Sequence, residues 1–173
     1  MVMSMNSHEK YMQVALKQAQ EALVQGEFPV GVVFVHKGQI VASGKREHTH
    51  EQKETVNEID HAEILALRSF LAKETTIPLD ELTVYSTMEP CLMCYATMIL
   101  NGIRNMVYAY EDVMGGGTNL PLELLNPLYA EMKVNVVPHV LRQESLELFK
   151  QFFSDPENLY WKDSLLANYT LSK

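Results

Sequence analysis

Two cysteines, Cys91 and Cys94, stand three positions apart directly after a proline, and the 173-residue chain contains no others. They follow "LTVYST", which has the composition of a β-strand, and they begin a stretch with helical spacing. Unpaired backbone N–H groups and the positive end of the dipole at a helix start favour thiolate over thiol. The C-x-x-C motif by itself leaves two interpretations open, a thiol redox pair and two ligands of a zinc site.

A His-x-Glu motif, His61 and Glu63, lies upstream of the cysteines at another predicted helix start. A Cys-Cys-His set leaves the fourth position of tetrahedral zinc open for water, as in catalytic zinc sites, and Glu63 would lie beside that water. Taken singly, these residues have simpler explanations, because Asp60 and Glu63 can form a helix N-cap with its partner and His61 can be a polar first-turn residue. Together, H-x-E and P-C-x-x-C match the signature of the zinc nucleobase deaminases.

The elements that must position these residues alternate between helical and strand-like periodicity. Helical crossovers between strands predict an α/β fold with a central, at least partly parallel sheet that carries helices on its faces. In chain order we expect a helix over 8–24, a hairpin that turns at Lys37-Gly38, a polar loop over 45–60, a helix over 61–72, a strand over 81–87, a helix over 91–102, a strand over 105–110, a short helix over 122–131, a strand over 132–137 and a final helix over 143–153.

Length, composition and charge limit the classes of protein to which this chain can belong. With 173 residues and 47% hydrophobic content, we expect one domain over residues 1–173 that buries a core. The N-terminus lacks the pattern of a signal peptide, and no apolar stretch is long enough to span a bilayer, so we expect a cytoplasmic protein without a membrane partner. A net charge of −8 provides no basic footprint for a nucleic acid.

The chain resembles the cytidine-deaminase-like superfamily, specifically its branch of bacterial tRNA adenosine deaminases, guanine deaminases and fungal cytosine deaminases. "FPVGVVFV" is similar to the first strand of that branch, and "HAEILALR" and "TMEPCLMCYATMI" are similar to its two metal-bearing helices. The resemblance implies that His61, Cys91 and Cys94 bind Zn²⁺ and that Glu63 is the catalytic proton shuttle. It also implies a three-layer α/β/α fold with a five-stranded mixed sheet, and a homodimer.

Hydrolytic deamination explains why these residue types are needed. An aromatic amine is a poor leaving group on a modestly electrophilic ring carbon, so a strong nucleophile must exist at neutral pH. Zinc lowers the pKa of a bound water toward about 7, and Glu63 can accept the proton as hydroxide forms. The same carboxyl then passes that proton to the ring nitrogen and helps the amine to leave as ammonia.

The C-terminal stretch "KQFFSDPENLYWKDS" is similar to the tail of fungal cytosine deaminases, in which an aspartate closes over the base. The alignment places Tyr160, Trp161 and Asp163 in a lid, where rings would stack on a flat heterocycle and the carboxylate would accept hydrogen bonds from its N–H groups. The two aromatic residues can equally pin the tail to the protein body. Glu111 matches an acidic position of guanine and cytosine deaminases where the tRNA enzymes tend to have arginine.

Further substrate contacts are expected next to the matched motifs. An asparagine in the loop after the second strand usually contacts the base in this branch, but Arg46 stands at that position here, and Asn57 is a candidate replacement. The remaining expected contacts are Pro29, Val30, Glu89 and Pro90.

These observations favour a zinc-dependent hydrolase that deaminates a small nucleobase or nucleoside, such as a cytosine- or guanine-like heterocycle. The alternative within the same chemistry is a tRNA-specific adenosine deaminase, which is disfavoured because the chain has no run of Lys and Arg to neutralise phosphates. An alternative of another class is a thiol redox protein that uses Cys91 and Cys94. A third is a binding module with a silent zinc site, against which the intact Glu63 argues.

Overall fold

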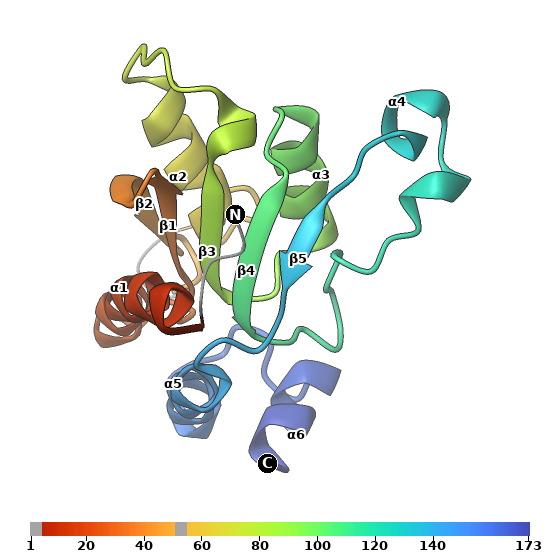
Figure 1. Ribbon diagram of the computed structural model, residues 1–173. Helices are drawn as coiled ribbons and strands as arrows, with labels where there is room; N and C mark the ends of the chain where they lie inside the picture. The colour runs from red at the N-terminus through yellow and green to blue at the C-terminus, as the bar shows by residue number, and fades with distance from the viewer. Residues whose placement is uncertain (1–4, 51–54) are drawn as a thin grey trace.

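A five-stranded mixed sheet forms the centre of the protein in a computed structural model that describes residues 5–50 and 55–173 (Figure 1). The strand order is β2-β1-β3-β4-β5; β1 pairs antiparallel with β2 and β3, while β4 runs parallel to β3 and β5. The expected α/β fold with a five-stranded mixed sheet is confirmed. The strands are β1 (Gly31–His36), β2 (Gln39–Lys45), β3 (Thr83–Met88), β4 (Asn105–Tyr110) and β5 (Asn135–Val137).

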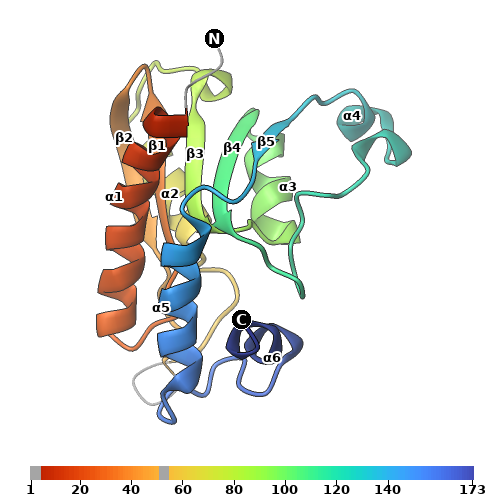
Figure 2. The ribbon, with the colours of Figure 1, turned by 60° about the horizontal axis from the view of Figure 1, so that its bottom comes forward.

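Helices cover both faces of the sheet and complete the three layers (Figure 2). The helices α1 (Met5–Val24) and α5 (Arg142–Ser154) pack on one face, with α1 against β1 and β3 and α5 against β4. On the other face, α2 (Ala62–Leu71) packs against β1 and β2, and α3 (Leu92–Leu100) contacts α2. Within residues 5–50 and 55–173, no helix has the length and apolar composition needed to cross a bilayer.

The hairpin is confirmed, and the polar loop after it is confirmed over the residues described. Lys37 and Gly38 both have positive φ, the conformation of the tight turns that match strand twist. Residues 46–50 and 55–60 form no helix or strand, whereas residues 51–54 of the expected loop lie outside the described residues.

The expected short helix over 122–131 is wrong as a single element. It is split into a 3-10 turn, η2 (Leu122–Leu124), and one helical turn, α4 (Pro127–Ala130). Asn126 between them is extended, because proline at the next position disfavours helical backbone before it. A further 3-10 turn, η1 (Leu79–Glu81), precedes β3.

The helix expected over 143–153 is present as α5, but it is not the last helix. A second C-terminal helix, α6 (Leu165–Leu171), follows it and packs against α5. The hydroxyl of Ser164 accepts a hydrogen bond from the backbone N–H of Ala167, which is a standard N-cap. Serine directly before an apolar run is a helix-start signal that the sequence carries at this position. Residues 155–164 between α5 and α6 form the C-terminal segment, in which the ring of Tyr160 packs against Phe28, just before β1.

Candidate active site

The N-termini of α2 and α3 bring three metal-ligating side chains together. His61 and Cys91 are the N-cap residues of α2 and α3, and Cys94 lies in the first turn of α3. The Sγ atoms of both cysteines lie 3.5 Å from Nδ1 of His61, and the three donor atoms lie within 4.8 Å of one another. The parallel strands β3 and β4 end beside these three side chains, and only two residues separate the end of β3 at Met88 from Cys91.

This donor set fits zinc in its geometry. With Zn–S near 2.3 Å and Zn–N near 2.0–2.1 Å, tetrahedral angles place sulfur and nitrogen about 3.5 Å apart. The observed Sγ–Nδ1 separations of 3.5 Å therefore need no rearrangement of either helix. Two thiolates and an imidazole also leave one tetrahedral position open, which is the pattern of a catalytic site and not of a closed structural one.

The protonation of the two thiols is coupled. A hydrogen bond from Cys94 and a second one from His61 lower the pKa of Cys91 to about 4, although burial opposes the shift. The hydrogen bond to Cys91 and burial raise the pKa of Cys94 well above its usual value. The pair therefore holds one thiolate readily, and a divalent cation would displace the remaining proton on binding.

Glu63 lies in the first turn of α2 and is 3% exposed. Burial and the nearby Cys91 raise the pKa of its carboxyl, while His61 lowers it. The hydroxyl of Ser86 in β3 donates a hydrogen bond of 3.5 Å to Oε1 of Glu63. A buried carboxyl with a raised pKa, next to a metal donor set, has the properties of a general acid and base.

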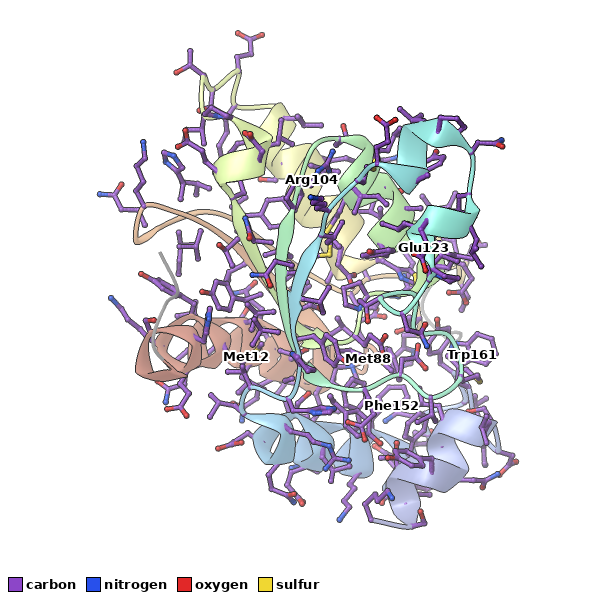
Figure 3. The ribbon with its side chains drawn as sticks, turned by 45° about the vertical axis from the view of Figure 1, so that its right-hand side comes forward. Met12, Met88, Arg104, Glu123, Phe152 and Trp161 are labelled. Atoms are coloured by element: carbon purple, nitrogen blue, oxygen red, sulfur yellow. The ribbon has the colours of Figure 1, made fainter. Side chains whose placement is uncertain are left out.

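A cavity of about 410 Å³ opens over Glu63, His61 and Cys91. Its wall is mostly apolar and aromatic, with a few carboxylates and one guanidinium, as is typical of small-molecule sites. Met88, at the end of β3, and Trp161, from the C-terminal segment, are both labelled in Figure 3. The lining residues are Phe28, Val30, Arg46, Glu58, His61, Ala62, Glu63, Met88, Glu89, Cys91, Met93, Asp112, Met114, Gly115, Tyr160, Trp161 and Leu166.

Four of the eight residues that the sequence nominated for substrate binding line this cavity: Val30, Glu89, Tyr160 and Trp161. The other four, Pro29, Pro90, Glu111 and Asp163, are not among its described lining residues. Both prolines are buried beside the cavity wall. Asp163 is exposed in a left-handed turn, and its backbone carbonyl accepts a hydrogen bond from Asn168.

Glu111 is held in a polar cluster at the end of β4. Its carboxylate accepts two hydrogen bonds from Arg142, at 2.5 and 2.7 Å, and one from the Tyr169 hydroxyl at 2.7 Å. Burial raises the pKa of Glu111, but these hydrogen bonds outweigh it and lower the pKa to about 2. Glu111 therefore joins β4 to α5 and α6 in this structure.

Glu89 holds the glycine-rich loop, residues 111–121 after β4, through hydrogen bonds. Its carboxylate accepts hydrogen bonds from the backbone N–H of Asp112 and from the backbone and hydroxyl of Thr118. Gly117 donates to the carbonyl of Pro90, and a Cβ at Gly117 would lie 2.6 Å from Cα of Leu92. The glycine run thus allows the loop to pack directly on the N-terminus of α3.

Sequence reasoning predicted the polar loop but missed Glu58 as a residue of the cavity wall. Arg46 is 2% exposed and lines the cavity, where its guanidinium donates to the backbone carbonyls of Asn57 and Asp60. Asn57 is not a described lining residue; its side chain bonds within its own turn, to Ile59 and Asp60. The signal in the sequence was Arg46, which stands where related deaminases have a base-contacting asparagine and so indicated that the contacts of this loop differ from theirs.

The three-layer fold and the His-Cys-Cys donor set beside a buried glutamate define a zinc-dependent hydrolase that acts on C–N bonds. Residues 5–110 match the family model of the cytidine and deoxycytidylate deaminase zinc-binding region, and the chain belongs to this family. The match removes the support for the thiol redox alternative, because the two thiols and the histidine are part of one zinc-binding region.

Relatives within the family differ in substrate. The chain is 32% identical over 151 residues to a tRNA-specific adenosine deaminase of Bacillus subtilis, covering 87% of this chain and 91% of that protein. A solved tRNA:A34 deaminase has a TM-score of 0.65 and 28% identity, covering 80% of this chain and 98% of the other. A guanine deaminase structure from Bacillus subtilis has a TM-score of 0.52 and 30% identity, covering 60% and 64%.

Proposed function

We propose that this protein is a zinc-dependent deaminase that converts adenosine in tRNA to inosine. The observation that carries the deaminase chemistry is the buried Glu63, which lines the cavity with His61 and Cys91 next to the donor set that Cys94 completes. The similarity to tRNA-specific adenosine deaminases over 87% of the chain supports the substrate. This support is stronger than that for the small-nucleobase interpretation which the sequence favoured.

The residues of the site divide the work. Zinc, when held by His61, Cys91 and Cys94, supplies a Lewis acid that lowers the pKa of water toward about 7. Glu63 takes the proton of the attacking water, delivers it to the ring nitrogen, and then helps the amine leave as ammonia, so one water is consumed for each ammonia released. The apolar wall excludes bulk water, which strengthens each of these electrostatic interactions.

A free aminopurine or other small nucleobase is the second candidate substrate. Two specific observations favour it: the net charge of −8, and the position of Tyr160 and Trp161 on the cavity wall. Aromatic side chains on this wall suit stacking on a free heterocycle. A tRNA would require a local cluster of cations, because phosphate neutralisation dominates nucleic-acid affinity.

We also propose that the protein is a homodimer in which α3 and the arm formed by η2 and α4 take part. Leu92 and Leu100 of α3 are 54% and 55% exposed, and Leu124 and Leu128 of the arm are 78% and 61% exposed. The arm projects from the sheet on the side of α3 and β5 (Figures 1 and 2). Exposed apolar side chains gathered in this way are typical of an interaction surface.

The test of the substrate offers both candidates to the same zinc-loaded protein. One arm uses a tRNA transcript with adenosine in the anticodon loop and measures inosine after nuclease digestion; the other measures ammonia from adenine, guanine, 2,6-diaminopurine and cytosine. Inosine in the tRNA, absent with Glu63→Ala, is the expected result. Ammonia from a free base alone would move the assignment to the second candidate. With zinc bound, no product in either arm would contradict deamination.

A further inference from the structure

A single carboxylate oxygen connects the metal site to the C-terminal segment. Oε2 of Glu58 lies 3.2 Å from Nε2 of His61, the ring nitrogen that faces away from the thiols. The same oxygen accepts a hydrogen bond of 2.8 Å from the Tyr160 hydroxyl. Tyr160 is buried and belongs to the segment that precedes α6, a hundred residues away along the chain. Glu58 therefore contacts a metal donor and the cavity wall at once.

His61 requires a partner on Nε2. Its Nδ1 faces Cys91 and Cys94, so the proton of the neutral ring must reside on Nε2 when Nδ1 binds a metal. An acceptor at Nε2 fixes this tautomer and the orientation of the ring, and it makes the ligating nitrogen more basic. Glu58 supplies such an acceptor from three positions before the histidine, on the same turn of chain.

Arg46 holds this carboxylate in place. Its Nη2 lies 3.3 Å from Oε2 of Glu58 and 3.3 Å from the Tyr160 hydroxyl, and its guanidinium lies 5.6 Å from the centre of the Tyr160 ring. The guanidinium is fixed in turn by the carbonyls of Asn57 and Asp60. Because the buried cation is paired with the carboxylate and with carbonyls, the charge of Glu58 is compensated beside the cavity.

We propose that Glu58 is a positioning residue that couples zinc binding at His61 to the closure of the C-terminal segment through Tyr160. When zinc is held at Nδ1, the Nε2–H group of His61 donates a hydrogen bond to Glu58 and orders that carboxylate, which then accepts a hydrogen bond from the Tyr160 hydroxyl. By linkage, seating of Tyr160 strengthens zinc binding by the same factor by which zinc favours the seated segment. The coupling rests on the zinc site and does not depend on which amine is deaminated.

Zinc affinity tests the first half of the coupling. Competition with a chromogenic chelator should show zinc bound about 10- to 100-fold more weakly by Glu58→Ala. Glu58→Gln, which keeps an acceptor oxygen, should recover part of this loss. The cobalt-loaded protein should show a changed visible absorption spectrum in Glu58→Ala, because the imidazole is no longer held in one orientation. The exposed Glu123, on the arm, provides the matched control Glu123→Ala, which should bind zinc and cobalt as the wild type does.

Tryptophan fluorescence tests the second half. Trp161 is the single tryptophan of the chain and adjoins Tyr160, so its emission reports on this segment. Adding zinc to the metal-free wild type should lower the acrylamide quenching constant of Trp161, whereas Tyr160→Phe and Glu58→Ala should show a smaller change or none. Tyr160→Phe removes one oxygen only, so this arm remains decisive if Glu58→Ala does not fold.

The coupling is overturned if Glu58→Ala binds zinc with wild-type affinity, or if zinc changes Trp161 quenching equally in the wild type and Tyr160→Phe. No turnover is measured in either arm. An inactive protein with normal coupling would therefore contradict the proposed function alone, and an active protein without the coupling would contradict this inference alone.

Discussion

At the scale of single residues, environment assigns different tasks to carboxylates of similar type. Glu63 is buried, and its raised pKa suits a group that exchanges protons. Glu111, paired with Arg142 and Tyr169, has its pKa lowered to about 2 and stays ionised. Glu58 is fixed between His61 and Tyr160 as an acceptor. The surroundings of each side chain, and not its type, separate the three proposed roles of proton shuttle, structural support and positioning.

The first prediction concerns Glu63. Glu63→Ala should retain stoichiometric zinc, because the carboxylate is not one of the three donors, and should lose turnover by about 10²- to 10⁴-fold because no group moves the proton. Metal analysis of the purified variant and the inosine and ammonia assays provide the two measurements. Retention of full activity would refute the proton-shuttle role, while loss of zinc would mean that the residue supports the metal site.

The second prediction concerns the stability contributed by Glu111. Its pKa is lowered from 4.5 to about 2, so the stabilisation is complete above about pH 4.5 and is lost as the pH falls toward 2. Glu111→Gln should lower the free energy of unfolding at pH 7 by about 1–2 kcal/mol, since a half-buried, hydrogen-bonded ion pair loses one charge. Urea unfolding at pH 7, 4 and 3 should show that the difference in unfolding free energy between the wild type and Glu111→Gln becomes smaller as the pH falls. A difference in unfolding free energy that does not change with pH would contradict the stabilising role of the ionised Glu111.

At the scale of elements, the site depends on how closely the glycine loop approaches α3. Gly116 pairs with Cys91 in an isolated bridge, and Gly117 packs on the backbone of Leu92. These contacts fix the first turn of α3, from which both thiols project. The loop and the helix N-terminus therefore position the metal donors as one unit.

The third prediction tests this close approach. In Gly117→Ala, the new Cβ would lie 2.6 Å from Cα and 2.8 Å from the backbone nitrogen of Leu92, and neither can move without displacing α3. We expect a loss of about 1–3 kcal/mol in unfolding free energy and weaker zinc binding. Gly115→Ala is the matched control, because its nearest neighbour is the terminal carboxylate oxygen of the Asp112 side chain at 3.1 Å and not the backbone of α3. Equal zinc affinity in both variants would show that the contact does not position Cys91.

At the scale of the whole molecule, the sheet, the C-terminal segment and the arm have separate roles. The sheet sets α2 and α3 side by side, the segment with Tyr160 and Trp161 closes one wall of the cavity, and the arm presents exposed leucines next to α3. Assembly through the arm would leave the cavity wall made by the C-terminal segment within each protomer.

The fourth prediction tests the proposed homodimer. Leu100→Lys places a charge on the exposed end of α3 and should shift the protein from dimer to monomer in sedimentation velocity, with zinc content unchanged. Leu171→Lys, at a leucine of similar exposure on α6, is the control and should remain dimeric. A wild-type protein that sediments as a monomer over the whole concentration range would contradict the proposal.

The sequence by itself determined the fold and the metal donors of this protein. Strand and helix periodicity identified the central elements, because the buried face of a strand or helix places apolar residues at regular intervals along the sequence. The motifs around His61 and Cys91 were equally visible, since the donors occur within two short helix starts. Tertiary structure alone decided the surroundings of the site. Glu58 and Tyr160 are 102 positions apart, and no local pattern reports that one carboxylate serves both this tyrosine and His61. Long-range packing brings such residues together, and it also carries Glu111 away from the cavity into its pair with Arg142.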